Sequence, residues 1–177
     1  MEALQHRLQT IAALGRTIAE EGGVNGSRCM DRSKLKAEVA YALDSEGAPG
    51  EIVIGAPGQY KYKISVHGKK AHGGLEPEKG INAIMIAAKA LAEVERYGRI
   101  DEETTCNIGL IGGGVATNVV PDLVEIEGDV RSRNNEKLEA MREEIVSTIC
   151  NAVEKYGAKV TAEVEHKHSS FRIDTNS

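Results

Sequence analysis

Apolar and polar residues alternate along most of the chain beyond its first third. Residues 60–67 are Tyr-Lys-Tyr-Lys-Ile-Ser-Val-His, so every second side chain is apolar. This period of two predicts a strand with one buried face. The same pattern recurs at 105–110, 123–131 and 160–164, which predicts three further strands.

Two segments with apolar residues at three- and four-residue spacing predict helices between these strands. The first is expected over about 77–97 and ends before Gly98. Its expected apolar face consists of Ile81, Ile84, Met85, Ala88, Leu91 and Val94. The second is capped by Asn134 or Asn135 and ends at Gly157. Its stripe consists of Leu138, Met141, Ile145, Ile149, Val153 and Tyr156.

The order strand, helix, strand, strand, helix, strand predicts an α+β fold of the ferredoxin-like βαββαβ type. In this fold an antiparallel sheet carries two helices on one face. We expect residues 58–166 to form this domain. Residues 1–57 are an irregular piece before it, and residues 167–177 are a short return segment.

The composition of the chain argues against nucleic acid and a membrane as partners. The net charge of −5 and the low aromatic content of 3% argue against nucleic acid, which is bound through cationic and stacking surfaces. No apolar run is long enough to cross a membrane. The three cysteines form no CxxC pair, which favours a reducing cytoplasm over a disulfide framework or a zinc knuckle.

Three acidic residues in the first part of the chain are candidates for chemistry. Glu20 and Glu21 follow an apolar stretch and precede two glycines, and Asp44 also follows an apolar run. Adjacent side chains at a strand end point in different directions. One carboxylate could therefore bind a metal while its neighbour polarises a water. A solvated turn or helix end is the alternative for the pair.

Three later residues are also candidates. His72 lies among glycines on a loop, where it could donate a hydrogen bond to an oxyanion. The glycine-rich segment 112–118 lacks the Gly-Lys-Ser/Thr of a phosphate loop, and it ends at Asn118. Arg131 ends a strand on its polar face, where it could clamp a carboxylate. A surface histidine, a plain connection and a surface ion pair are the respective alternatives.

Five ordered segments together resemble the peptidase T-like branch of the di-zinc exopeptidases, a family that includes glutamate carboxypeptidase and aminoacylase. The segments are 20–23, 41–47, 67–83, 112–121 and 129–132. The resemblance implies that 58–166 is a lid or dimerisation domain. It also implies that 1–57 is an incomplete α/β fragment of a catalytic domain.

The resemblance also implies roles for the acidic candidates. Glu20 would be the general base that takes a proton from a metal-bound water. Glu21 would ligate one zinc ion and Asp44 the other. The implied activity is the hydrolysis of small peptides by an aminopeptidase or tripeptidase.

For the lid, the resemblance implies a homodimer in which His72 stabilises the oxyanion, reaching across to the other subunit. Asn118 and Arg131 would orient the backbone or carboxylate of the peptide substrate.

The chain departs from this family in its metal ligands. The family has a His-x-Asp motif and a bridging Asp before the Glu pair, and a His ligand near the end of its catalytic domain. None of the five histidines here is followed two residues later by Asp. A di-zinc site needs about five protein ligands, and Glu21 and Asp44 supply only two. We therefore expect this chain alone to be inactive. The alternative is a stand-alone ferredoxin-like dimerisation or small-molecule-binding module that uses no metal.

Overall fold

The computed structural model describes residues 26, 29–31, 33, 48 and 50–174. The chain divides into two compact units, 1–53 and 54–177. In the first unit, the carboxylate of Asp31 accepts hydrogen bonds from the backbone and hydroxyl of Ser33. The second unit contains the sheet and both predicted helices. The boundaries at 57/58 and 166/167 stay predictions.

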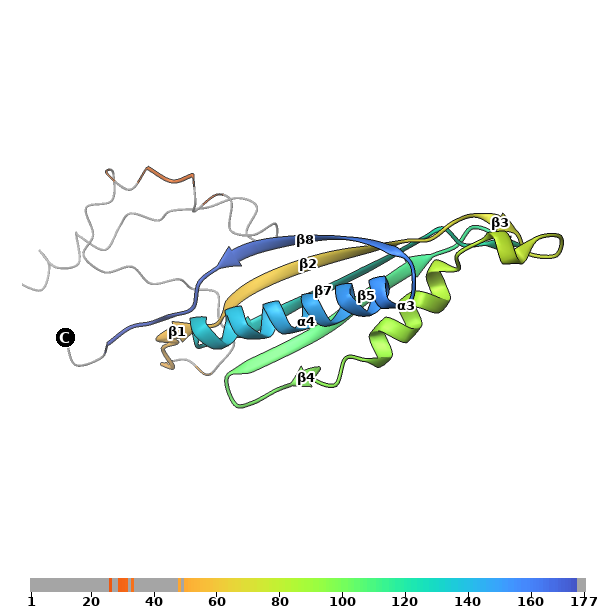
Figure 1. Cartoon of the computed structure of the whole chain (residues 1–177). Helices are drawn as coiled ribbons and strands as arrows, with labels where there is room; N and C mark the ends of the chain where they lie inside the picture. Colours follow the sequence, from red (N-terminus) through yellow and green to blue (C-terminus); the bar gives the residue numbers. More distant parts are fainter. Residues whose placement is uncertain (1–25, 27–28, 32, 34–47, 49, 175–177) are drawn as a thin grey trace, which may run out of the picture. The chain divides into compact units, whose positions relative to one another are not determined.

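The second unit is built on a five-stranded sheet with the order β4-β5-β7-β2-β8. All neighbouring strands in it are antiparallel. The bounds are β4 Gly98–Arg99, β5 Thr104–Gly113, β7 Leu123–Ser132, β2 Gly58–His67 and β8 Lys159–His168. The helices α3 (Ala83–Ala92) and α4 (Asn135–Lys155) lie on one face of this sheet (Figure 1). The predicted α+β fold is therefore confirmed.

Short elements that the sequence did not predict complete the unit. They are β1 Gly55–Ala56, β3 Ala71–His72, the 3-10 turn η2 Pro77–Lys79, β6 Val119–Val120 and β9 Phe171–Arg172. β1 pairs with β9, and β3 pairs with β6. No helix among the described residues is long and apolar enough to cross a membrane.

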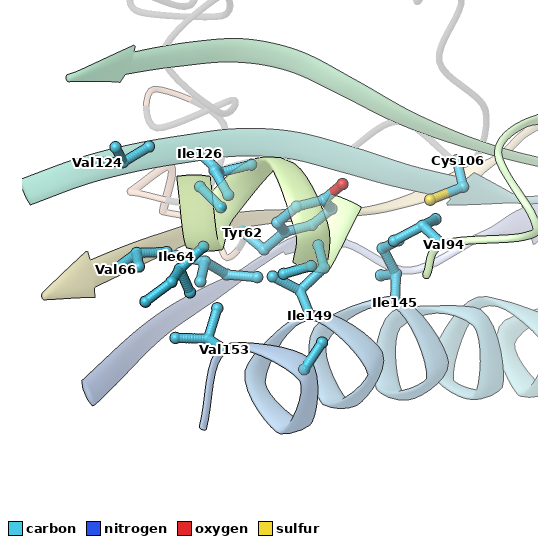
Figure 2. Close-up of a cluster of buried hydrophobic side chains, with 14 of the residues drawn as sticks. Tyr62, Ile64, Val66, Val94, Cys106, Val124, Ile126, Ile145, Ile149 and Val153 are labelled. Carbon is cyan, nitrogen blue, oxygen red and sulfur yellow. The ribbon is translucent and has the colours of Figure 1, made fainter. Parts of the chain in front are cut away.

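The core lies between the sheet and the helices and is almost entirely aliphatic (Figure 2). On β2, Tyr62, Ile64 and Val66 are buried, and Ile64 lies opposite Ile126 of β7. Full burial of such a side chain contributes about 1.5–3 kcal/mol. The predicted alternation therefore gives the sheet one covered face and one polar face.

The buried hydroxyl of Tyr62 on β2 has a hydrogen-bond partner. The hydroxyl of Tyr62 donates to the backbone oxygen of Asn107 at 2.9 Å. Asn107 lies next to the register shift between Ile108 and Leu110 in β5. Burial raises the pKa of the Tyr62 hydroxyl far above its ordinary value, so the hydroxyl remains a donor.

The second helix, α4, has the predicted cap and most of the predicted apolar stripe. The side chain of Asn134 accepts hydrogen bonds from the backbone N–H groups of Glu136 and Lys137, which caps α4. Gly157 follows the helix with a φ of +87°, a conformation that favours glycine. Five residues of the predicted stripe are buried: Leu138, Met141, Ile145, Ile149 and Val153.

The first helix is shorter than predicted. The predicted span of 77–97 is wrong because Gly80 is extended and Asn82 caps a new start, accepting from the N–H of Met85 at 3.0 Å. The helix ends at Ala92, with Glu93 as its cap.

Half of the predicted apolar face is also wrong, because Ile84, Met85 and Ala88 are exposed. Val94 is buried, and Ile81 and Leu91 pack against the core, as predicted. Within α3 the buried residues are Ala83, Ile86, Ala87 and Ala90. Three of the four buried residues are alanines, whose small side chains let α3 pack closely against α4, β7 and β2. The prediction rested on large apolar side chains, and it therefore missed the alanines that face the core.

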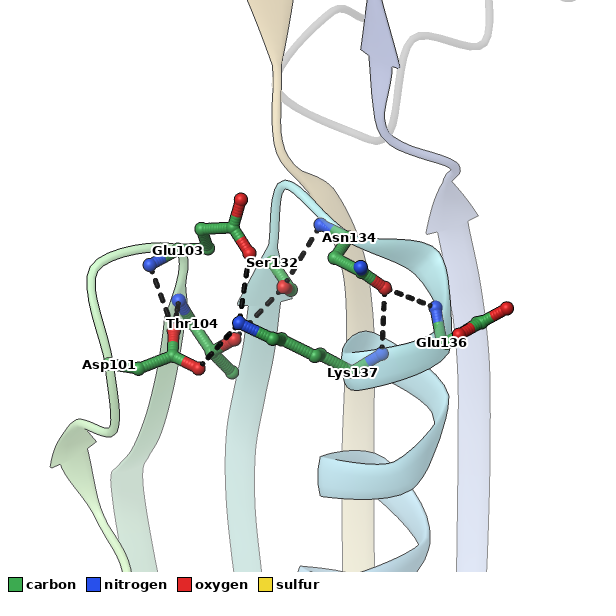
Figure 3. A network of polar contacts seen from close by, with 7 residues as sticks. All are labelled: Asp101, Glu103, Thr104, Ser132, Asn134, Glu136 and Lys137. Atoms are coloured by element: carbon green, nitrogen blue, oxygen red, sulfur yellow. Dashed lines mark hydrogen bonds and ion pairs between the residues drawn. The ribbon is translucent and has the colours of Figure 1, made fainter.

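A polar network joins the turn before β5 to the first turn of α4 (Figure 3). Asp101 accepts hydrogen bonds from the backbone N–H groups of Glu103 and Thr104 at 2.8 and 2.7 Å. The ammonium of Lys137 lies 3.1 Å from Asp101 and 2.9 Å from Glu103. These contacts lower the pKa of Asp101 to about 2. The hydrogen bond from the N–H of Glu103 has the largest effect, and the hydrogen bond from Lys137 has the next largest.

We predict that Asp101→Asn destabilises the protein at neutral pH and that the difference disappears in acid. A pKa that folding lowers stabilises the folded state above the ordinary pKa of about 4, and this stabilisation is lost as the pH falls toward the folded value. Urea unfolding of both proteins at pH 7 and near pH 2 measures the difference. Glu102→Gln, which removes a carboxylate from the same turn, is the control. An equal destabilisation at both pH values would contradict the prediction.

Candidate functional site

The six predicted site residues fall into two groups in the structure. Glu20, Glu21 and Asp44 lie outside the described residues, so their roles as general base and zinc ligands stay predictions. His72, Asn118 and Arg131 all lie in the second unit. Among the described residues, no group of three or more His, Cys, Asp or Glu side chains could hold a metal ion.

His72 and Asn118 lie together at the tip of the unit, beyond the end of β2 (Figure 1). His72 of β3 pairs with Val119 of β6. The next residue, Gly73, donates its backbone N–H to the carbonyl oxygen of Asn118 at 2.8 Å. Two loops that are far apart in the sequence therefore hold these two residues side by side.

Close backbone packing explains the glycine at the base of this tip. Lys69 and Ile81 exchange two backbone hydrogen bonds of 2.9 Å, which closes the loop that carries His72. A Cβ atom at Gly68 would lie 2.1 Å from the carbonyl oxygen of Ile81, so a larger residue cannot fit there. The glycine that the sequence shows before His72 is thus required by the geometry of the tip.

A hydrogen bond from the backbone orients the ring of His72. The backbone N–H of Gly74 donates to Nδ1 of His72 at 3.2 Å. Because Nδ1 accepts this bond, Nε2 carries the proton of the neutral imidazole. The side chain is exposed. The arrangement presents an N–H donor to solvent, and such a donor can stabilise an oxyanion.

Arg131 lies on the polar face of the sheet, opposite Gln59 of β2. Its Nε donates to Asp129 at 2.7 Å, and the side-chain amide of Gln59 donates to the same carboxylate oxygen at 2.8 Å. The arginine side chain is still more than half exposed. Asp129 and Gln59 therefore orient a guanidinium that remains accessible to a carboxylate ligand.

The two residues that orient Arg131, Asp129 and Gln59, were not predicted from the sequence. Asp129 precedes Arg131 by two positions on the same strand, so the period of two places both on one face. The sequence alone could therefore have indicated Asp129. It could not have indicated Gln59, because the position of Gln59 beside Arg131 depends on the register between β2 and β7.

The structure separates Arg131 from the tip. β2 runs from Gln59, opposite Arg131, to His67, and the tip lies beyond His67. Eight residues of strand at about 3.3 Å each span about 26 Å. A tripeptide spans at most about 11 Å. Within one chain, His72 and Arg131 therefore cannot contact the same small peptide.

Comparison with known proteins places the second unit in a family. Residues 54–157 match the family described as the peptidase dimerisation domain of the M20 peptidases. The Bacillus subtilis protein YqjE is 44% identical over 156 residues, which are 88% of this chain and 42% of that protein.

Two solved structures are also similar. The aminopeptidase PepT of Bacillus cereus is 42% identical, with a TM-score of 0.80, over 91% of this chain and 43% of that one. A tripeptidase of Staphylococcus aureus is 35% identical, with a TM-score of 0.84, over the same two shares. The chain thus spans less than half the length of the relatives that it matches.

We predict that neutral His72 carries its proton on Nε2. Two-dimensional 15N NMR of the imidazole groups distinguishes the tautomers, since a protonated and an unprotonated ring nitrogen differ strongly in chemical shift. Gly74→Pro removes the N–H that Nδ1 accepts, and we expect it to shift His72 toward a mixture of tautomers. The signals of His67, which contacts Thr161 through Nε2, serve as the internal control. A proton found mainly on Nδ1 of His72 would contradict the prediction.

Proposed function

Because this chain belongs to the M20 peptidase dimerisation domain family, we propose that it forms part of a zinc-dependent hydrolase of small peptides, of the aminopeptidase or tripeptidase type. The observation that carries the proposal is the match of residues 54–157, combined with the exposed His72 N–H at the tip. The proposed location is the cytoplasm, which suits a chain without a disulfide framework.

The resemblance to the di-zinc exopeptidases suggests roles for the acidic residues in the first part of the chain. Glu21 and Asp44 would each ligate one of two zinc ions, and Glu20 would take the proton from the attacking water. Zinc, when bound, lowers the pKa of that water and polarises the peptide carbonyl. Glu21 and Asp44 are fewer than the roughly three protein ligands that a catalytic zinc ion requires, so we propose that these 177 residues are inactive on their own.

The lid residues would bind the peptide as it reacts. His72 would donate its Nε2–H to the oxygen of the tetrahedral intermediate, with Asn118 fixed beside it by the bond from Gly73. Arg131, oriented by Asp129, would clamp a carboxylate of the substrate. The separation of about 26 Å along β2 supports a homodimer in which His72 acts across the interface.

We predict that the purified chain with added zinc does not hydrolyse a tripeptide such as Ala-Ala-Ala at a measurable rate. Two proposed ligands are fewer than one catalytic zinc requires, about three. Calorimetric titration with zinc tests the proposed ligands. Stoichiometric binding that Glu21→Ala and Asp44→Ala abolish, and that the control Glu51→Ala leaves unchanged, would support them.

Two outcomes would contradict the predicted inactivity or the proposed zinc ligands. Turnover that a chelator stops would show that the chain is active alone. No zinc binding at all would favour the alternative function, a dimerisation or small-molecule-binding module that uses no metal.

We predict that His72 contributes to turnover once the catalytic part is present. Residues 54–174, which lie within one compact unit, can replace the matching segment of the Bacillus cereus aminopeptidase. In this chimera, His72→Ala should lower kcat about 100- to 1,000-fold, as the loss of one oxyanion donor does, with a smaller change in KM. His67→Ala, at the end of β2, is the matched control. Equal rates for both variants would exclude the proposed role.

A further inference from the structure

The guanidinium of Arg131 shares its hydrogen-bond acceptor with a second donor. Oδ2 of Asp129 accepts from Nε of Arg131 at 2.7 Å and from the side-chain amide of Gln59 at 2.8 Å. The Asp129 side chain is 22% exposed, whereas that of Arg131 is 55% exposed. The carboxylate is therefore held from two strands, β7 and β2, and it fixes the Nε side of a guanidinium that solvent can reach.

The position of Lys61 shows that this pairing is directed. Lys61 of β2 lies directly opposite Asp129 in the register of β2 and β7, and opposite charges at such positions attract each other. Within the part of the chain that the structure describes, the ion pair of Asp129 is nevertheless with Arg131, two residues along the same strand, and none joins it to Lys61. The bond from Gln59 keeps the carboxylate oxygen beside Arg131.

The remaining donors of Arg131 all lie on its two Nη atoms. A guanidinium carries one N–H on Nε and two on each Nη. Because Asp129 accepts the Nε–H, a second carboxylate cannot use the edge formed by Nε and one Nη. The edge formed by the two Nη atoms has no hydrogen-bond partner among the described residues. A carboxylate can bind this edge through two parallel hydrogen bonds.

We infer that Asp129 is the positioning residue of the proposed substrate clamp: it fixes the plane of the Arg131 guanidinium, so that a free carboxylate of the peptide binds through both Nη atoms. This rests on the proposed function and names the feature of the substrate that is recognised. Gln59 supports the arrangement by fixing Asp129. The pair of Asp129 and Arg131 carries no net charge, so recognition depends on the geometry of two hydrogen bonds more than on charge.

Removal of the Asp129 carboxylate has opposite effects under two alternative roles. A carboxylate that merely lies near the site repels a carboxylate substrate, so Asp129→Ala would tighten binding. A carboxylate that positions Arg131 has the reverse effect, because the freed guanidinium must be ordered when the substrate binds. Asp129→Asn keeps an oxygen acceptor, so it should restore much of the positioning. The direction of the change therefore distinguishes the two roles.

The first measurement uses the full chain and needs no turnover. Exchange of the Arg131 Nε–H with water, followed by 15N NMR and assigned with Arg131→Lys, reports the hydrogen bond to Asp129. We expect Asp129→Ala to accelerate this exchange about tenfold, as the loss of one charged hydrogen bond does, and Asp129→Asn to accelerate it less. Glu127→Ala, two residues earlier on the same strand, is the matched control and should have no effect. Equal exchange in the parent chain and in Asp129→Ala would overturn the inference.

The second measurement is the steady-state kinetics of the chimera described above, with Ala-Ala-Ala and its C-terminal amide as substrates. Asp129→Ala should raise KM for Ala-Ala-Ala about tenfold, with a smaller change in kcat. It should also lower the preference for the free acid over the amide. Adding Asp129→Ala to Arg131→Ala should change neither quantity further, because Asp129 acts through Arg131. Glu127→Ala is again the control.

The outcomes separate this inference from the proposed function. A KM for Ala-Ala-Ala that falls or stays the same in Asp129→Ala would overturn the positioning role, although the chimera still hydrolyses peptides. A chimera without turnover would count against the proposed function, and the exchange of the Nε–H in the full chain would then decide the role of Asp129. Circular dichroism checks that each variant is folded.

Discussion

The position of β2 at the inside of the sheet, between β7 and β8, is the constraint on which the rest of the second unit depends. Its register sends Tyr62, Ile64 and Val66 into the core and leaves Lys61 and Lys63 on the polar face. A slip of one residue would exchange these two sets. Each buried side chain so exposed would cost about 1.5–3 kcal/mol. The alternation therefore fixes the helices on one face and Arg131 on the other.

The same strand sets the distance between the two proposed substrate contacts. One end of β2 lies beside Arg131, and the other end leads to the tip that carries His72. The buried side chains along β2 hold this part of the strand in the core. The length of a well-packed strand, about 26 Å over eight residues, thus favours a site that two chains share.

Much of this fold was predictable from the sequence because large apolar residues carry most of the signal. The alternation gave all four long strands, and the stripe and the Asn134 cap gave α4. α3 was misplaced because its buried face consists mainly of alanines, and pattern analysis gives alanine little weight. The β3–β6 pair was missed because two-residue strands have no period. For the same reason His72 and Asn118 could be proposed separately, but their contact through Gly73 could not be foreseen.

The two edges of the sheet differ in charge and in coverage. Charged residues line the edge strand β8, whereas β5 carries none and pairs with β4 only in its first part. The register shift of β5 lies beside Asn107, whose carbonyl oxygen accepts the hydrogen bond from Tyr62. The buried hydroxyl of β2 is thus satisfied next to the place where β5 departs from regular pairing with β7.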